Sequence, residues 1–489
     1  MQHFGHFIDG AFTQPDGVID SINAATGDVW CQFSRGQAQH AERAILSAQS
    51  AFDTWSAKSG AERADVLEQL ADTLSQRWEE LVEAEIGDNG KRITEVRGQL
   101  SGLHGWFRPA AQQARDLVPH DQGNTLAGVR SEQQYLPFGV VVAITPWNSP
   151  LMILAWKLAP ALAAGNTVVV KPSEMASAST LLFADMAHQA GLPAGVLNVV
   201  TGFGHEVGEP LVRHPLTRKV TFTGSDAGGR KVAETAASNV IPTTLELGGK
   251  SPQVVFADCD LDDAVNGILS GIFLSNGQTC VAGSRLIVER SVKAELVSRL
   301  VSRAGGLKLG DPMDPQTQIA PLANEPHLKK VTAMITQAKD DGARCLLDGL
   351  ETARGRSGFF VGPTLFDDVT PDMQLWRDEV FGPVLAITSF DTEDEAIALA
   401  NDSNYGLAAG VWTMDDDKGA RVAQAIQAGT VYINHYRSVD PMSPIGGLKL
   451  SGYGRELGPE AIKAFLQIKS VWTGTSSVPD PFPDDVEAQ

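Results

Sequence analysis

Cysteine is scarce in this sequence. The 489 residues include only 4 cysteines, and none of them belongs to a CxxC pair or lies near a histidine cluster. Neither a metal site nor a disulfide framework is therefore indicated. The N-terminal residues also lack the basic start and the apolar stretch of a signal peptide, so we expect a cytoplasmic protein.

Positive charge is also in short supply. Lysine and arginine total 39 against 59 aspartates and glutamates, which gives a formal net charge of −20. Such a field repels nucleic-acid phosphates and anionic lipids, so we expect neither nucleic acid nor membrane as a partner. A site for an anionic ligand would have to be built locally, from backbone N–H groups, a helix N-terminus and a few lysines.

No uninterrupted apolar run is long enough to span a membrane. The most apolar stretch, residues 138–170, is broken by Pro146, Lys157, Pro160 and Gly165. A lipid-exposed helix does not readily accommodate such breakers together with a charge. The stretch therefore predicts a buried strand, a polar turn, a helix and a second buried strand.

The remaining pattern is that of an α/β protein with more than one domain, because the chain is too long for one core. Helical periodicity covers residues 38–85, and helices are expected to dominate the first hundred residues. Beyond residue 140, β-branched runs alternate with helical patterns, which is typical of parallel sheets. The expected strands are residues 140–144, 167–170, 196–200 and 219–222, followed by 253–256 and 285–289 in a second section with a helix at 259–273.

Two further segments, residues 131–136 and 467–471, alternate polar and apolar side chains. We interpret them as exposed strands that pair across subunits. The tail from Thr475 is rich in Pro, Asp and Ser, and we expect it to be mobile or to lie along the surface.

The clearest chemical feature is the turn Ser275-Asn276-Gly277-Gln278-Thr279-Cys280, which follows an apolar helix. A cysteine thiol is a strong nucleophile once ionised, and a turn can expose it while backbone N–H groups stabilise the thiolate. A single cysteine is more often a small buried hydrophobe, so the interpretation depends on its partners.

One such partner is Glu246, which lies between two leucines before a double glycine. Apolar surroundings raise a carboxyl pKa toward neutrality, as a general base requires. The alternative is a solvated glutamate at the end of a strand or helix. Another partner is Asn148, expected at the carboxyl edge of a parallel sheet, where it could donate to an oxyanion or merely form a turn.

The dinucleotide fingerprint GxGxxG is absent from the expected cofactor region. In its place, a buried strand ends in Lys171 with Glu174 close behind, a pair able to bind ribose hydroxyls. A second strand enters the turn at Gly224 and Ser225 before a helix, so its N–H groups can face a pyrophosphate.

Seven motifs in this order resemble the aldehyde dehydrogenase superfamily, and the resemblance runs from about Ala38 to Val471. The motifs are Pro146-Trp147-Asn148, Lys171-Pro172-Ser173-Glu174, Phe222-Thr223-Gly224-Ser225, Leu245-Glu246-Leu247-Gly248-Gly249-Lys250, Gly277-Gln278-Thr279-Cys280, Glu379-Val380-Phe381-Gly382-Pro383 and Ser451-Gly452-Tyr453-Gly454-Arg455-Glu456.

The resemblance implies a subunit in three parts that assembles as a homodimer or homotetramer. A Rossmann-like cofactor domain would comprise residues 1–117 and 138–248, and an α/β catalytic domain residues 249–449. A β-rich oligomerisation arm with the C-terminal tail would comprise residues 118–137 and 463–489.

The resemblance also implies an NAD(P)-dependent oxidation of an aldehyde to a carboxylic acid, through a thioester hydrolysed by water. Cys280 matches the nucleophile, Glu246 the base, and Asn148 an oxyanion donor beside the Cys280 backbone N–H. Lys157 and Glu456 match positions that support the active site and its proton movement. A CoA-acylating enzyme, or a catalytically silent protein of the same fold, is the alternative.

Thirteen residues match cofactor-binding positions: Thr145, Trp147, Lys171, Ser173, Glu174, Gly204, Gly208, Phe222, Gly224, Ser225, Leu247, Glu379 and Phe381. Lys171 and Glu174 match contacts to the adenosine ribose, and Ser225 matches the pyrophosphate contact. Glu379 and Phe381 match the nicotinamide-ribose contacts. The Glu174 carboxylate should repel a 2′-phosphate, so NAD is favoured, while use of NADP stays open.

The substrate region departs from the family pattern. Ser149, Val439 and Ile445 replace aromatic side chains, which leaves Trp156 as the main aromatic residue expected there. A roomier or more polar pocket favours bulky, cyclic or functionalised aldehydes. Arg437 could bind a substrate carboxylate, although a surface or subunit-interface charge is the favoured interpretation for it and for Arg108.

Overall fold

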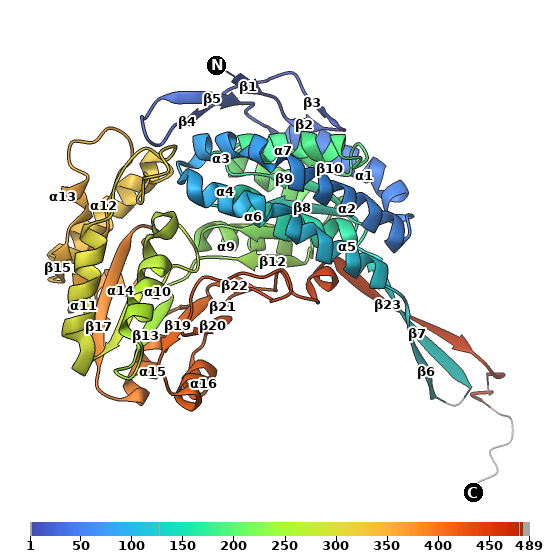
Figure 1. Cartoon of the computed structure of the whole chain (residues 1–489). Helices are drawn as coiled ribbons and strands as arrows, with labels where there is room; N and C mark the ends of the chain where they lie inside the picture. Colours follow the sequence, from blue (N-terminus) through green and yellow to red (C-terminus); the bar gives the residue numbers. More distant parts are fainter. Residues whose placement is uncertain (1, 127, 479, 483–489) are drawn as a thin grey trace, which may run out of the picture.

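The computed structural model describes residues 2–126, 128–478 and 480–482. Two α/β bodies lie side by side, and a long arm extends away from them (Figure 1). The arm consists of β6 (His120–Leu126), β7 (Val129–Pro137) and β23 (Leu466–Gly474).

The first body is built on an eight-stranded sheet with the order β22-β12-β11-β8-β9-β10-β2-β3. Its outer strands are β22 (Gly452–Tyr453) at one edge and β2 (Phe7–Ile8) with β3 (Ala11–Phe12) at the other. Its five central strands are parallel: β12 (Thr243–Glu246), β11 (Thr217–Thr223), β8 (Val140–Ile144), β9 (Thr167–Lys171) and β10 (Leu197–Val199). Every residue of β8 and β9 is buried. The four strands expected between residues 140 and 222 are therefore confirmed, and burial on both faces explains their valine-rich sequences.

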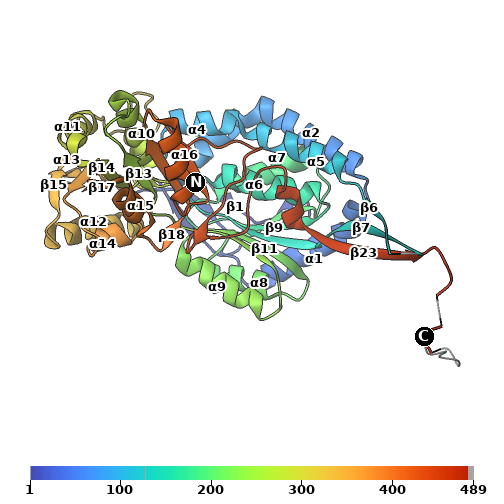
Figure 2. The same cartoon turned by 90° about the horizontal axis from the view of Figure 1, so that it is seen from below.

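Helices cover both faces of this sheet (Figure 2). On one side lie α6 (Pro150–Ala163) and α7 (Ala178–Gln189), and on the other lie α1 (Ala38–Ser56), α8 (Glu209–Arg213) and α9 (Asp226–Ala237). Helix α6 connects β8 to β9, as expected for residues 138–170. Within the described residues, no helix combines the length and apolarity needed to cross a bilayer.

The second body contains a seven-stranded sheet with the order β15-β16-β17-β14-β13-β19-β20. The inner strands β13 (Pro252–Val255) and β14 (Arg285–Glu289) are parallel neighbours, with α10 (Leu261–Phe273) between them in sequence. The remaining parallel strands are β16 (Thr364–Asp367), β17 (Val384–Phe390), β19 (Ala408–Trp412) and β20 (Thr430–Ile433), and β15 (Arg344–Leu347) is antiparallel at the edge.

Helices dominate the first hundred residues, as expected, except in the N-terminal stretch up to Phe33. Five short strands come first, namely β1 (Gln2–Phe4), β2 (Phe7–Ile8), β3 (Ala11–Phe12), β4 (Ile19–Ile22) and β5 (Val29–Phe33). Strands of 2–5 residues are too short to display an alternating pattern. Helices α1, α2 (Gly60–Arg77), α3 (Val82–Asn89), α4 (Ile93–Ser101) and α5 (Phe107–Asp116) follow.

The two segments of the arm that were expected to be strands are β7 and β23. They pair with each other in one chain, from Leu466 opposite Pro137 to Gly474 opposite Val129, and their expected pairing across subunits stays a prediction. Residues 475–478 and 480–482 of the tail are exposed. The expectation for the rest of the tail falls on positions 479 and 483–489, which lie outside the described residues.

Candidate active site

The turn that carries Cys280 has an unusual backbone. It leaves α10 through a short 3₁₀ segment in which Ser275 and Asn276 have φ angles of 53° and 54°. This left-handed conformation is costly for residues other than glycine and persists only where the surroundings enforce it. Gly277, with φ of 69°, follows, and a Cβ there would lie 2.1 Å from the Gly382 carbonyl oxygen.

Side-chain amides hold this turn in place. The Asn276 amide donates to the Ala320 carbonyl and accepts the Ala320 N–H at 3.1 Å. The Gln278 side chain accepts the Ala323 N–H at 2.9 Å. The nucleophile loop, defined as residues 275–280, is thus fixed on a segment more than forty positions downstream in the chain.

Asn148 reaches this loop from the first body. It lies in the turn between β8 and α6, two residues before the helix begins, and its Nδ2 donates to the Gln278 carbonyl at 2.9 Å. One N–H of the amide remains for a second acceptor. Asn148 and Cys280 both line a cavity of about 210 Å³, together with Leu247, Glu379 and Phe381.

Glu246 ends β12, and the chain beyond it runs against the nucleophile loop. A Cβ at Gly249 would lie 2.4 Å from the Cys280 carbonyl oxygen. The Glu246 side chain is 7% exposed, and its Oε1 has no hydrogen-bond partner among the described residues. Burial, with the nearby Glu456 charge, raises the pKa of Glu246 well above its ordinary value.

Lys157 and Glu456 form a buried ion pair behind Glu246. The Lys157 Nζ lies 2.5 Å from the Glu456 carboxylate, and both contact the Thr221 hydroxyl, at 3.2 and 3.3 Å. The two charges act oppositely on the Glu246 pKa, since Glu456 raises it and Lys157 lowers it. The five residues expected to be catalytic are therefore brought to one region.

The Cys280 thiol is harder to ionise than expected from the sequence. Burial raises its pKa to about 12, and the carboxylates of Glu379 and Glu246 act in the same direction. The backbone N–H groups of Val281 and Cys280 lower the pKa, as anticipated, but they do not outweigh burial.

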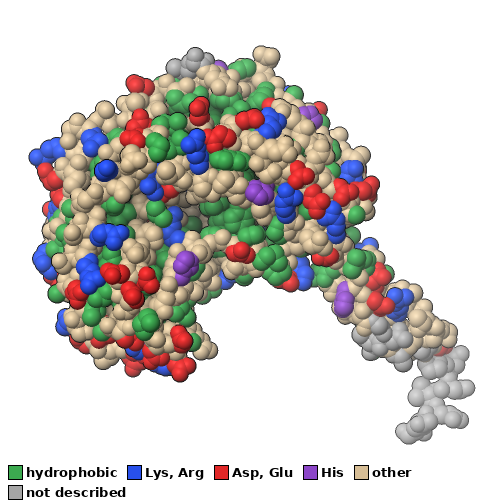
Figure 3. All heavy atoms as spheres, viewed as in Figure 1, with side chains coloured by type: hydrophobic (Ala, Val, Ile, Leu, Met, Phe, Trp, Pro, Cys, Tyr) green, Lys and Arg blue, Asp and Glu red, His purple; other side chains and the backbone are tan. Residues whose placement is uncertain are grey.

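A second cavity, of about 440 Å³, adjoins the first and shares Trp147, Gly224 and Ser225 with it. In the space-filling view the surface is hollowed between the two bodies, and hydrophobic side chains are visible in the hollow (Figure 3). Ten of the thirteen residues expected to bind the cofactor line this second cavity: Thr145, Trp147, Lys171, Ser173, Glu174, Gly204, Gly208, Phe222, Gly224 and Ser225.

Lys171 and Glu174 form the polar end of this cavity. The Lys171 ammonium donates to the Glu174 carboxylate at 3.1 Å and to the Pro172 carbonyl at 2.9 Å. Burial lowers the Lys171 pKa. Ser225 caps α9 and accepts the Gly228 N–H at 3.2 Å, so the first N–H groups of that helix face the cavity end where an anion would bind.

Glu379 and Phe381 line the smaller cavity, the one that contains Cys280. The Glu379 carboxylate accepts the Gly249 N–H at 2.8 Å, and burial raises its pKa to about 7. Phe381, with φ of 61°, packs edge-on against Trp147 with ring centroids 5.4 Å apart.

Two polar residues that line this cavity, His327 and Lys330, were not expected from the sequence. His327 contacts the Phe381 carbonyl at 2.6 Å, and burial lowers its pKa to about 4. Both residues lie on α12 (Glu325–Asp340), whose sequence shows only an ordinary amphipathic helix with an Asn324 cap. No local signal marks them, because only the tertiary fold brings this helix to the site.

The apolar side of the site is more aromatic than expected. Trp156 is joined by Trp106, with ring centroids 5.6 Å apart, and Tyr432 packs in the same cluster beside Cys280. The expectation that Trp156 is the main aromatic residue is therefore corrected. Trp106 precedes α5 and Tyr432 lies on β20, so neither is adjacent to a motif.

The two arginines left open have different roles. Arg108 forms an exposed ion pair with Asp72 at 2.8 Å, as expected for a surface charge. Arg437 corrects the expectation, because its guanidinium turns inward and donates to the Ser270 and Leu274 carbonyls at 3.1 and 3.0 Å.

Comparison with known proteins identifies the family. The family model described as "Aldehyde dehydrogenase family" matches residues 12–471. The chain is 41% identical to a peroxisomal aminoaldehyde dehydrogenase 1 of Pisum sativum, over 97% of this chain and 96% of the relative. It is 40% identical to a (Z)-2-((N-methylformamido)methylene)-5-hydroxybutyrolactone dehydrogenase of Acinetobacter baylyi, over 99% of both.

Solved structures agree with this result. A crystal structure of betaine aldehyde dehydrogenase from Staphylococcus aureus in complex with NAD⁺ superposes with a TM-score of 0.95 at 35% identity, covering 98% of this chain and 96% of that chain. The expected α/β fold and NAD(P)-dependent oxidation of an aldehyde to an acid are thereby confirmed. The chain belongs to the aldehyde dehydrogenase family.

Proposed function

We propose that this enzyme works through a thioester on Cys280, which water hydrolyses with Glu246 as general base. The observation that carries the proposal is the shared cavity of Cys280 and Asn148. Glu246 lies close enough to act on the Cys280 pKa, and its buried Oε1 has no hydrogen-bond partner within the part of the chain that the structure describes. A carboxylate base suits transfer of the acyl group to water, whereas a CoA-acylating enzyme would need no such base.

In the first half of the reaction, the Cys280 thiol releases its proton to water and the sulfur adds to the aldehyde carbon, so that the carbonyl π bond breaks and its oxygen becomes an oxyanion. Asn148 donates its remaining N–H to the oxyanion, beside the Cys280 backbone N–H. NAD⁺, when bound, would supply the acceptor for the hydride that the carbon of the adduct loses, which leaves the thioester on Cys280. Burial disfavours the Cys280 thiolate. The side chains around the thiol therefore influence the Cys280 pKa and thus the formation of the nucleophile.

In the second half, Glu246 removes a proton from water while the water oxygen attacks the thioester carbon. The C–S bond then breaks, releasing the carboxylic acid and the Cys280 thiolate. Lys157 and Glu456 tune Glu246, since their charges act on its pKa in opposite directions. Their buried pair also provides a route for the proton that Glu246 accepts.

On the cofactor side, Lys171 and Glu174 would bind the adenosine ribose, Ser225 the pyrophosphate, and Glu379 with Phe381 the nicotinamide ribose. Glu174 is the reason to favour NAD, because its carboxylate would face a 2′-phosphate. We also propose that residues 1–117 with 138–248, and 249–449, act as cofactor and catalytic domains, with residues 118–137 and 463–489 as arm and tail.

The substrate we propose is a functionalised aldehyde, bulky, cyclic or polar. Trp106, Trp156 and Tyr432 form an aromatic wall beside Cys280. The named relatives include an aminoaldehyde dehydrogenase and a hydroxybutyrolactone dehydrogenase, whose names both imply functionalised substrates. Screening NADH formation across aliphatic, aromatic, amino- and carboxy-aldehydes would identify the class.

We further propose a cytoplasmic homodimer or homotetramer. The outer strand of the arm supports assembly, because Ile468 and Trp472 on β23 are 66% and 56% exposed. All 4 cysteines are free, as a reducing compartment requires. Light scattering after size-exclusion chromatography would distinguish the assemblies.

The direct test of the proposed nucleophile is Cys280→Ala. We expect loss of NADH formation with retained NAD⁺ binding, measured by quenching of tryptophan fluorescence. Substantial residual turnover would contradict the proposal. Acid formation by the parent enzyme without CoA would separate hydrolysis from acyl transfer to a thiol.

A further inference from the structure

The peptide between Leu274 and Ser275 has both of its polar groups held by charged side chains. The Leu274 carbonyl accepts a hydrogen bond from Arg437 Nη1 at 3.0 Å. The Ser275 N–H donates to both carboxylate oxygens of Glu95, at 2.9 and 3.1 Å. Charge-assisted bonds of opposite polarity therefore fix the orientation of this peptide, at the point where the chain enters the nucleophile loop.

Arg437 does more than hold one carbonyl. It also donates to the Ser270 carbonyl at 3.1 Å and lies 3.4 Å from the Ser275 hydroxyl. Ser270 and Leu274 bracket the C-terminus of α10, where carbonyl groups lack helical partners and a cation is favoured. The guanidinium thus satisfies carbonyl groups at the C-terminus of α10, directly before the left-handed turn at Ser275.

The neighbouring Tyr436 holds the other end of the loop. Its hydroxyl donates to the Val281 carbonyl, directly after Cys280, at 2.9 Å. The ring is buried and packs against two glycines, because a Cβ at Gly271 or Gly410 would lie 3.0 Å from it. Adjacent residues of one segment therefore contact the chain on both sides of the nucleophile.

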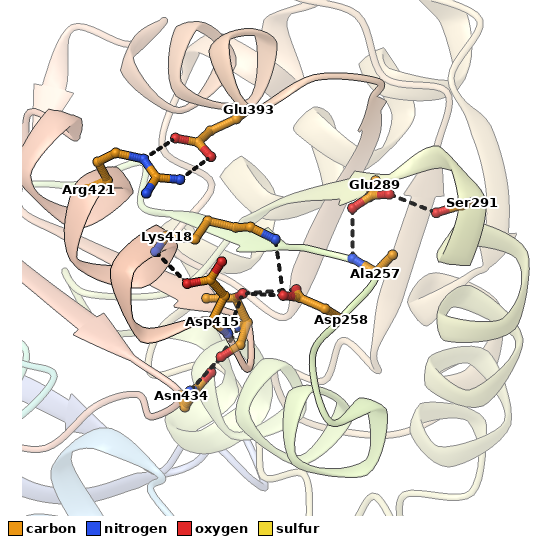
Figure 4. Close-up of polar contacts among 10 residues, drawn as sticks. Ala257, Asp258, Glu289, Ser291, Glu393, Asp415, Lys418, Arg421 and Asn434 are labelled. Atoms are coloured by element: carbon orange, nitrogen blue, oxygen red, sulfur yellow. Dashed lines mark hydrogen bonds and ion pairs between the residues drawn. The ribbon is translucent and has the colours of Figure 1, made fainter.

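This segment is itself anchored on the second sheet. Asn434 accepts the Thr413 N–H at 3.0 Å and donates to the Thr413 carbonyl at 2.8 Å. The Thr413 hydroxyl bonds to Asp258 at 2.9 Å, and Lys418 reaches the same carboxylate at 3.0 Å (Figure 4). The support of Arg437 and Tyr436 is thus tied to strand ends rather than to a free loop.

Glu95 is braced from the other side. Arg92 pairs with it at 2.7 Å, and a second nitrogen of Arg92 lies 3.3 Å from the Thr317 carbonyl. Helix α4 carries Glu95, so the first and second bodies both take part in holding Ser275.

We propose that Arg437, Tyr436 and Glu95 are positioning residues that hold the nucleophile loop in its strained, productive conformation. The inference rests on the proposed role of Cys280 as nucleophile. Without Arg437, the strained turn at Ser275 and Asn276 is free to relax, which moves the thiol relative to Asn148 and admits water. Misplacing the Cys280 thiol by about an ångström slows the chemical step but leaves the distant adenosine site intact.

The test compares Arg437→Gln, Arg437→Lys and Tyr436→Phe with the exposed control Arg108→Gln. Arg437→Gln should lower kcat by roughly tenfold or more, with the Kd for NAD⁺ unchanged. At the same time, alkylation of Cys280 by iodoacetamide, followed by peptide mass spectrometry, should become faster, because the thiol, which is half-buried in the parent, becomes more exposed. Arg437→Lys should recover part of kcat, and Arg108→Gln should match the parent in both measurements.

The outcomes separate the positioning role from other roles. Unchanged kcat in folded Arg437→Gln and Tyr436→Phe overturns the inference, as does a higher aldehyde KM with unchanged kcat and alkylation rate, which would indicate substrate binding. Should Arg437→Gln fail to fold, Tyr436→Phe decides alone, because it removes only a hydroxyl. Turnover by Cys280→Ala would instead refute the proposed nucleophile.

Discussion

The Lys157 ammonium lies 2.5 Å from the Glu456 carboxylate, and neither side chain is more than 4% exposed. A buried pair of this kind is costly to break, because the remaining charge is left without a partner in an apolar setting. The pair joins α6 to the C-terminal segment beside Glu246. The same two side chains therefore affect the stability of the fold and the pKa of the proposed base, Glu246.

Breaking this pair should therefore destabilise the enzyme. We expect Lys157→Met or Glu456→Gln alone to lower the free energy of unfolding by about 3–5 kcal/mol. The double variant Lys157→Met/Glu456→Gln should be more stable than either single variant, because no unpaired charge remains. Urea unfolding followed by circular dichroism measures this, and equal or additive losses would contradict the coupling.

The pH dependence should also respond to Glu456. A base whose pKa is raised by burial and by Glu456 is active only above that pKa, so thioester hydrolysis should rise with pH. Glu456→Gln removes a negative neighbour and leaves Lys157 unpaired, and both changes lower the Glu246 pKa. The midpoint of the kcat–pH profile should shift to lower pH, whereas a shift to higher pH would show that another group controls the rate.

Cofactor choice should depend on Glu174. Removing its charge with Glu174→Gln relieves repulsion of a 2′-phosphate and leaves Lys171 free to attract it. We expect the ratio of kcat/KM for NADP⁺ to that for NAD⁺ to rise about tenfold. Glu209→Gln is a matched control, since Glu209 lines the same cavity but is paired with Arg213 at 2.7 Å. An equal rise of this ratio in both variants would show that it reflects the net charge of the cavity and not the position of Glu174.

Gly249 should tolerate no side chain. A Cβ there would lie 2.4 Å from the Cys280 carbonyl oxygen, which is backbone and cannot easily move. Gly249→Ala should lower both kcat and the melting temperature. Gly98→Ala, on α4, has no atom within 4 Å of the added Cβ and should stabilise by about 0.5–1 kcal/mol through helix propensity. Differential scanning fluorimetry and steady-state kinetics measure both effects. A Gly249→Ala enzyme with the melting temperature and kcat of the parent would contradict the prediction.

Much of the fold follows from local sequence patterns. Residues 140–144 and 285–289 form strands at the expected positions, because strands buried on both faces require continuous apolar runs. The short N-terminal strands could not be predicted, since their pairing partners lie elsewhere in the chain.

The site was predictable to the extent that its residues occupy motifs. Cys280 and Asn148 line one cavity, as the sequence suggested. Trp106, His327 and Arg437 carry no local signal, because each acts on the site only through tertiary contacts. Even the Cys280 pKa depended on burial that no motif reveals.

The role of Glu246 can be tested by trapping the thioester. In Glu246→Gln the first half of the reaction should proceed, so mixing enzyme, aldehyde and NAD⁺ should give about one NADH per subunit in a burst. Intact-protein and peptide mass spectrometry should then find the acyl group on Cys280, with Cys280→Ala unlabelled. Normal turnover without an acylated Cys280 peptide would contradict the account.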